Sequence, residues 1–121
     1  VLTDVTETMA VYRDETFGPI VSIVPFDTKT DLLRMANDCE EGGLTAYIFT
    51  RNLARAEHYA ARLRYGEIQI NGVKYDIDLP HGGIGQSGIG HDCSARALHD
   101  YLVQKRITRA LDTTTLGGLN P

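Results

Sequence analysis

Residues 44–71 have the sequence LTAYIFTRNLARAEHYAARLRYGEIQIN, and this stretch decides the fold. Residues 44–50 and 67–71 contain the β-branched and aromatic side chains that are typical of strands. Between them Asn52 can cap a helix, Gly66 can end it, and apolar residues recur at spacings of three and four: Leu53, Ala56, Ala60 and Leu63. A strand, one amphipathic helix and a second strand predict a right-handed crossover and a parallel strand pair.

The residues before this unit continue the same alternation. Residues 20–26 form a short run rich in β-branched side chains between a Gly-Pro and an Asp-Thr dipeptide, which predicts a buried strand. Thr28 and Asp31 resemble a helix start, the Gly pair at 42–43 can end that helix, and its apolar stripe comprises Leu32, Met35, Ala36 and Cys39. The whole order therefore predicts an α/β fold with a parallel strand-helix-strand-helix-strand unit. Two helices cover little more than one face of such a sheet, so we expect further chain or a partner to cover the other.

The residues after the unit have a different character. Glycines recur at positions 82, 83, 85, 88 and 90, which predicts a shaped loop. We expect a third helix over residues 94–102 and a strand over residues 103–111, where apolar side chains recur at even spacing among charged ones. That strand would have an exposed edge, which is a natural site for pairing with another chain.

Composition narrows the classes of protein. The chain has 121 residues, with 12 Lys and Arg against 16 Asp and Glu and a formal charge of −4, as in one ordinary soluble domain. It has no apolar run of the roughly 18 residues that a membrane helix needs, and no dense basic block for nucleic acid. We therefore expect neither a membrane nor a nucleic-acid partner. Its two cysteines form no C-x-x-C pair, which favours a reducing, cytoplasmic location.

The glycine-rich loop contains a G-x-G-x-x-G match over residues 83–88, a pattern that binds a pyrophosphate when it follows a hydrophobic strand and opens a helix. Pro80 and His81 intervene after an Asp-containing stretch, and the helix is expected several residues later. A tight structural loop is therefore the favoured interpretation, and a small nucleotide-binding domain is the alternative. We expect no metal site, because the nearby candidate ligands have no familiar zinc spacing: His81, His91, Asp92, Cys93 and His99.

Glu15 and Phe17 are the candidate binding residues of the N-terminal segment. They stand two residues apart before Gly18-Pro19, so an extended chain projects both side chains to one side. A carboxylate can accept hydrogen bonds from the two vicinal hydroxyls of a ribose, and an aromatic face packs beside a planar heterocycle. The pattern alone leaves open a surface acid next to a core phenylalanine.

Three blocks of this sequence resemble the carboxy-terminal part of the NAD(P)-dependent aldehyde dehydrogenase superfamily. Residues 14–19 (DETFGP) match the motif E-x-F-G-P, and residues 36–50 match the helix-Gly-strand unit that follows it. Residues 79–90 (LPHGGIGQSGIG) match the loop P-F-G-G-x-K-x-S-G-x-G. The resemblance implies that residues 1–102 belong to the catalytic domain and that residues 103–121 form an oligomerisation strand and tail.

The resemblance also implies roles for individual residues. The intact enzyme would oxidise an aldehyde to a carboxylic acid with NAD or NADP, and would assemble as a homodimer or tetramer. Glu15 would bind the ribose beside the nicotinamide, and Phe17 would pack near the nicotinamide. The glycine-rich loop would line the aldehyde entrance, so that the substrate-pocket residues are His81, Gly82 and Gly83.

The family's catalytic cysteine, its general-base glutamate and its Rossmann domain all precede the region that this sequence resembles. We therefore expect no catalytic residue in this chain and no activity from the chain alone. An independent structural or oligomerisation module without catalysis is the alternative.

Three positions depart from the family's loop motif. His81 replaces its phenylalanine, Gly85 its lysine and His91 its arginine. An imidazole can donate or accept a hydrogen bond where a phenyl ring cannot, so His81 would make the aldehyde tunnel more polar. A short, hydroxylated or anionic aldehyde would then be favoured. The alternative is that His81 only replaces a packing aromatic.

Overall fold

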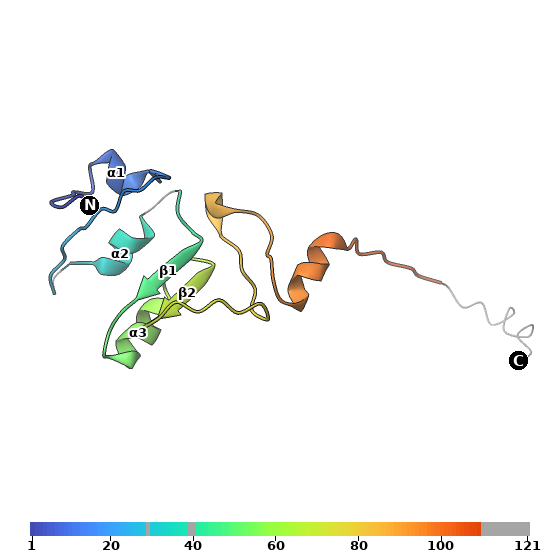
Figure 1. Ribbon diagram of the computed structural model, residues 1–121. Coiled ribbons are helices and arrows are strands. Elements are labelled where there is room, and N and C mark those ends of the chain that lie inside the picture. Colours follow the sequence, from blue (N-terminus) through green and yellow to red (C-terminus); the bar gives the residue numbers. More distant parts are fainter. Residues whose placement is uncertain (29, 39–40, 110–121) are drawn as a thin grey trace, which may run out of the picture.

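The structure is a computed structural model that describes residues 1–28, 30–38 and 41–109 (Figure 1). Two short helices come first, a strand-helix-strand unit follows as far as residue 70, and a long loop with two 3-10 helices comes last. The predicted α/β class is confirmed. The elements, in order, are α1 (Ala10–Arg13), α2 (Leu32–Asn37), β1 (Thr45–Ile48), α3 (Leu53–Ala60), β2 (Glu67–Ile70), η1 (Gly85–Ser87) and η2 (Ala95–Tyr101).

The centre of the structure is the parallel pair β1 and β2, joined by α3 (Figure 1). The register runs from Thr45 opposite Glu67 to Ile48 opposite Ile70. Ala56 on α3 is completely buried. The prediction of a parallel pair with a helical crossover over residues 44–71 is thus confirmed, with two strands in the sheet.

The sequence predicts a buried strand over residues 20–26, and this prediction is wrong. Ser22 forms one isolated parallel bridge with Leu2, and several apolar side chains of the segment are exposed. The flanking backbone bonds join Leu2 N–H to Val21 O at 2.8 Å and Ile23 N–H to Leu2 O at 2.8 Å. Pro25 has no N–H to continue this pairing, so the ladder stops after one bridge.

The helix starts agree with the sequence better than the helix ends do. The Asp31 and Asn52 side chains cap α2 and α3 by accepting the backbone N–H of the third residue after each, both at 3.0 Å. Both helices end earlier than predicted, at Asn37 and Ala60. Cys39, placed by the sequence on the stripe of α2, lies outside the described residues. The third predicted helix is present as the 3-10 helix η2.

No strand is present over residues 103–109, the described part of the predicted final strand. Val103 and Ile107 are almost fully exposed, and in Figure 1 this segment leaves η2 away from the other elements. A strand is held by a hydrogen-bonded ladder with a neighbour, and no described residue lies beside this segment to supply one. Residues 110–121 lie outside the described residues.

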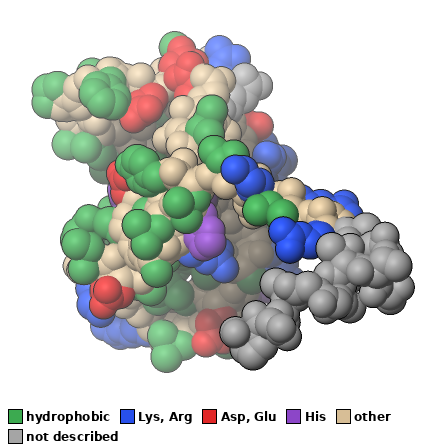
Figure 2. All heavy atoms as spheres, turned by 90° about the vertical axis from the view of Figure 1, so that its right-hand side faces the viewer, with side chains coloured by type: hydrophobic (Ala, Val, Ile, Leu, Met, Phe, Trp, Pro, Cys, Tyr) green, Lys and Arg blue, Asp and Glu red, His purple; other side chains and the backbone are tan. Residues whose placement is uncertain are grey.

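Few apolar side chains are buried in the part of the chain that the structure describes. Val5 and Ala56 are its two buried hydrophobic residues, and Figure 2 shows apolar side chains spread over the visible face. Isolated exposed apolar residues are normal, but exposure on this scale is not usual for a folded monomer. The described elements therefore form a layer that is still open to further packing.

Candidate functional site

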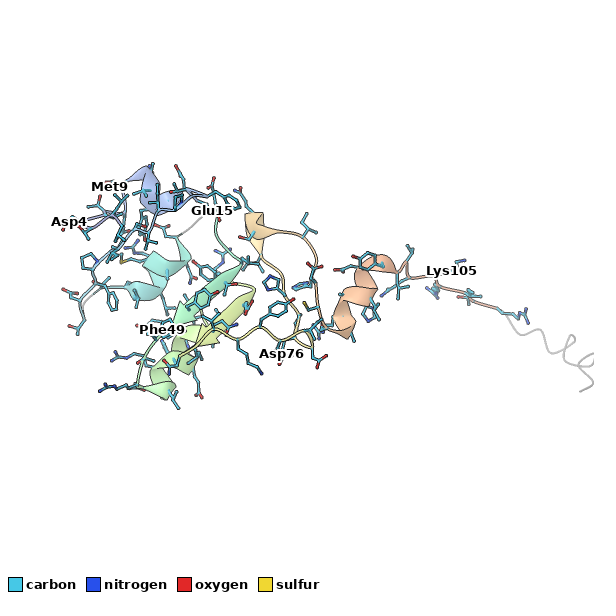
Figure 3. All side chains as sticks on the ribbon, in the orientation of Figure 1. Asp4, Met9, Glu15, Phe49, Asp76 and Lys105 are labelled. Carbon is cyan, nitrogen blue, oxygen red and sulfur yellow. The ribbon has the colours of Figure 1, made fainter. Side chains whose placement is uncertain are left out.

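Glu15 and Phe17 line the same pocket. Figure 3 shows Glu15 in the segment that follows α1. The pocket has a volume of about 280 Å³, and Thr16 and Gly18 contribute to its wall. Phe17 has a φ of 41° and is 92% exposed. A phenylalanine in this left-handed region is uncommon. The exposure rules out the interpretation of Phe17 as a core residue of the described chain.

Glu41 links this segment to the glycine-rich loop. Its side-chain Oε2 accepts the Glu15 N–H at 3.0 Å, and its carbonyl oxygen accepts the Ser87 hydroxyl at 3.3 Å. The two contacts join residues 26 and 46 positions apart in sequence. The local sequence does not single out Glu41, because no local spacing indicates contacts over such separations.

The glycine-rich loop is held by backbone bonds to the central unit. The Gly43 carbonyl accepts the N–H of Gly66 at 2.9 Å and of Ile84 at 3.0 Å. A β-carbon on Gly66 would collide with the Gly82 carbonyl group. The loop is therefore the shaped structure that the glycines predict, packed against the start of β2.

The G-x-G-x-x-G match at residues 83–88 has no strand before it and no α-helix after it. Residues 85–87 form the 3-10 helix η1, which ends at Gly88 with a φ of 145°. A dinucleotide fingerprint needs a helix N-terminus at this point. The geometry agrees with the structural-loop interpretation of this motif.

His81 lies at the start of the loop and pairs with Glu67, the first residue of β2. Its Nδ1 is 3.0 Å from Glu67 Oε2. The backbone of His81 is fixed by an antiparallel bridge with Asp92, with bonds of 2.9 and 2.7 Å. Hydrogen bonds from Gln69 and then from His81 lower the pKa of the Glu67 carboxyl. Glu67 was not foreseen, since a glutamate that begins a strand has no signal of its own.

Two pockets meet at His81. One, of about 320 Å³, is lined by Glu67, Gln69 and the segment 74–76 among others. The other, of about 220 Å³, is lined by Gly82, Gly83 and residues 87–92 among others. The three predicted substrate-pocket residues therefore line one pocket together, and His81 also contributes to the wall of its neighbour.

Cys93 is the cysteine within the described ranges, and its neighbour is a phenol. Its Sγ lies 3.0 Å from the Tyr75 hydroxyl, a contact that raises the pKa of Tyr75. No cationic side chain of the described residues is bonded to this thiol. In residues 1–28, 30–38 and 41–109 no group of three or more His, Cys, Asp or Glu side chains is arranged to hold a metal ion.

The sequence model of the aldehyde dehydrogenase family matches residues 1–107. The chain belongs to the aldehyde dehydrogenase family. Among its relatives, a mitochondrial succinate-semialdehyde dehydrogenase of Oryza sativa subsp. japonica is 40% identical over 108 residues, covering 88% of this chain and 20% of the relative. A betaine aldehyde dehydrogenase of Mesorhizobium japonicum is 43% identical over 108 residues, covering 88% of this chain and 22% of the relative.

Solved aldehyde dehydrogenases share the fold. A crystal structure of betaine aldehyde dehydrogenase from Staphylococcus aureus in complex with NAD⁺ matches with a TM-score of 0.77 at 33% identity, covering 84% of this chain and 20% of that one. The chain thus spans about a fifth of the length of the aldehyde dehydrogenases it matches. The helices of its described part are all too short to cross a membrane.

Proposed function

We propose that this chain is the carboxy-terminal part of an NAD(P)-dependent aldehyde dehydrogenase that oxidises an aldehyde to a carboxylic acid. The observation that carries the proposal is the family match over residues 1–107. Two features of the geometry support it: Glu15 and Phe17 share one pocket, and Glu41 ties their segment to the loop of His81.

The cofactor pocket suits one portion of a nicotinamide dinucleotide. An exposed carboxylate and an exposed ring around about 280 Å³ fit a ribose and a flat heterocycle, and the rest of the cofactor would bind elsewhere in the enzyme. Glu15 would accept hydrogen bonds from the ribose hydroxyls, and Phe17 would pack near the nicotinamide. The bound cofactor would supply the oxidising power as a hydride acceptor. Relatives solved with NAD⁺ support this assignment of the cofactor.

The substrate wall would consist of His81, Gly82 and Gly83, and the aldehyde would approach it through the glycine-rich loop. Residues 1–102 would belong to the catalytic domain. The segment 103–121 would add a strand to a neighbouring subunit in a homodimer or tetramer, which agrees with the exposure of Val103 and Ile107. Cysteine usage favours the cytoplasm as the location of the enzyme.

The reacting groups would come from the rest of the polypeptide. A thiolate nucleophile, a general base and an oriented nicotinamide must meet in one pocket, and this chain would supply one wall of it. The chain on its own would then be inactive. An independent structural or oligomerisation module is the second candidate, and the extended, exposed segment 103–109 is the observation that favours it.

The test is an aldehyde panel, run with NAD⁺ and with NADP⁺, on the full-length enzyme that contains this chain and on the chain alone. We expect reduced cofactor to form only with the full-length enzyme, in proportion to the aldehyde consumed. Full-length protein that oxidises no aldehyde with either cofactor would overturn the proposal and favour the structural module.

A further inference from the structure

The Glu67–His81 pair engages one ring nitrogen of an imidazole whose side chain is 36% exposed. A carboxylate only accepts hydrogen bonds, so the 3.0 Å contact makes His81 Nδ1 the donor. The other ring nitrogen, Nε2, has no hydrogen-bond partner among the residues that the structure describes. In a neutral imidazole with a proton on Nδ1, Nε2 is an acceptor. Glu67 thus selects the tautomer that offers an acceptor to a ligand.

The orientation of His81 is fixed from several sides. Glu67 accepts a further hydrogen bond from Gln69 Nε2 through its other carboxylate oxygen, so the carboxylate is itself held in place. The Tyr75 ring stands edge-on to the imidazole, with 6.2 Å between the centroids. The His81 backbone is bridged to Asp92. An acceptor held this way is pre-organised for a ligand.

The charges around the pocket of about 320 Å³, which His81 and Glu67 line together, disfavour an anion. Lys74, the one Lys or Arg among its described lining residues, has its Nζ 3.0 Å from an Asp76 carboxylate oxygen and is neutralised by it. The Glu67 carboxylate then remains as the excess charge, with its side chain 25% exposed. A ligand carboxylate would meet this negative charge and the Nε2 acceptor together. The volume of about 320 Å³ suffices for a small aldehyde.

We propose that the Glu67–His81 pair determines substrate specificity by favouring aldehydes with a hydrogen-bond-donating hydroxyl over apolar or carboxylate-bearing aldehydes of similar size. The inference rests on the proposed function and names its substrate class. It decides between the hydroxylated and anionic aldehydes that the sequence leaves open. His81 accepts the substrate hydroxyl at Nε2, and Glu67 is a positioning residue that holds the ring.

The test uses full-length enzyme and three small aldehydes: glycolaldehyde, propanal and glyoxylate. Glycolaldehyde and propanal differ by a hydroxyl in place of a methyl group, so their ratio of kcat/KM isolates the hydrogen bond. We expect the His81→Phe substitution to lower this ratio about tenfold, through KM for glycolaldehyde, because one hydrogen bond is lost. His81→Gln retains an acceptor near the position of Nε2 and should keep most of the ratio, whereas His81→Asn should not.

The Glu67→Gln substitution tests whether Glu67 positions the His81 ring or only stabilises the fold. It removes the charge and lets the side chain rotate, so the glycolaldehyde-to-propanal ratio should fall about threefold and kcat/KM for glyoxylate should rise. Glu7→Gln removes a carboxylate outside this pocket and is the matched control; it should change neither value. Thermal unfolding of each variant identifies those that fold. The comparison of substrate ratios with wild type needs only one folded His81 variant and Glu67→Gln.

Two results would be decisive against the inference. Unchanged substrate ratios in His81→Phe and Glu67→Gln, in enzymes that still oxidise propanal with NAD(P)⁺, would overturn it and leave the proposed function intact. Wild-type enzyme that prefers glyoxylate over glycolaldehyde would overturn it as well. Failure to oxidise any of the aldehydes would instead count against the proposed function.

Discussion

The central unit of residues 44–71 and the loop segment of residues 72–94 are consecutive in sequence but are held in different ways. In the unit, β1 pairs with β2, Asn52 caps α3, and Ala56 on α3 is completely buried. In the loop, the backbone is held by the His81–Asp92 bridge, and a row of alternate apolar side chains is exposed: Val73, Tyr75, Ile77 and Leu79.

The unit and the loop segment differ in what their residues do. The strand pairing and the helix cap that define the unit lie within it, so its own sequence predicts them. The loop carries the candidate substrate residues, and its alternate apolar side chains are exposed. Binding residues are often placed on loops that a rigid scaffold positions. Changes at the buried position of the unit should therefore affect folding. Changes in the loop, and at Glu67, which positions His81, should affect ligand binding.

The largest expected effect comes from a charge inside the unit. Ala56→Asp would bury a carboxylate in a site with no opening, and we expect a loss of about 3–5 kcal/mol in stability or failure to fold. Ala54→Asp on the same helix is the control, because Ala54 is exposed. Thermal unfolding and soluble yield of the full-length variants measure the difference. Equal stability of the two variants would contradict the assignment of Ala56 to the core.

The junction between unit and loop should be next in sensitivity. Gly66→Ala places a β-carbon against the Gly82 carbonyl, which must shift and move the candidate substrate wall. We expect a loss of about 1–3 kcal/mol in stability and a higher KM for aldehyde. Gly72→Ala, where the added β-carbon meets no atom, should behave like the wild type. Unaltered KM in Gly66→Ala would show that the wall does not depend on this packing.

The Glu41 bridge should have a smaller effect that appears in the cofactor rather than in the aldehyde. Glu41→Ala removes the acceptor of the Glu15 N–H, a loss of about 1 kcal/mol that corresponds to a roughly fivefold rise in KM for NAD(P)⁺. Glu41→Gln keeps an acceptor oxygen and should recover most of the affinity. Equal KM values for NAD(P)⁺ in Glu41→Ala and wild type would show that Glu41 does not help to hold the segment of Glu15 and Phe17 in place.

The sequence predicted what is encoded locally. Asn52 was identified as a helix cap, Asp31 was placed with Thr28 at a helix start, and the β1–β2 pair was identified from strands flanking one helix. Residues 20–26 were misassigned because β-branched composition does not reveal whether a partner strand is present, and Pro25 limits the pairing. Glu41 and Glu67 were missed because their roles come from contacts between distant residues.

The smallest expected effect is the pH dependence of an exposed ion pair outside both regions. Arg34 Nη1 lies 2.8 Å from Glu7 Oε2, and the hydrogen bond from Arg34 lowers the pKa of Glu7 below its usual 4.5. The pair therefore stabilises the fold above pH 4.5 and loses this contribution as the pH falls through the lowered pKa.

Thermal unfolding of wild type and Glu7→Gln measures this contribution. The difference in melting temperature should be small at neutral pH, decrease further in high salt, and shrink as the pH falls below 4.5. A difference that grows as the pH falls would contradict the sign of the pKa shift.

The central claim is that this chain supplies the ribose-binding carboxylate of a nicotinamide-dependent enzyme. Calorimetric titration of NAD(P)⁺ into full-length wild type and Glu15→Gln tests it most directly. Loss of charge-assisted hydrogen bonds should weaken cofactor binding about tenfold or more while the melting temperature of the free enzyme stays the same. Equal dissociation constants for the two proteins would contradict the claim.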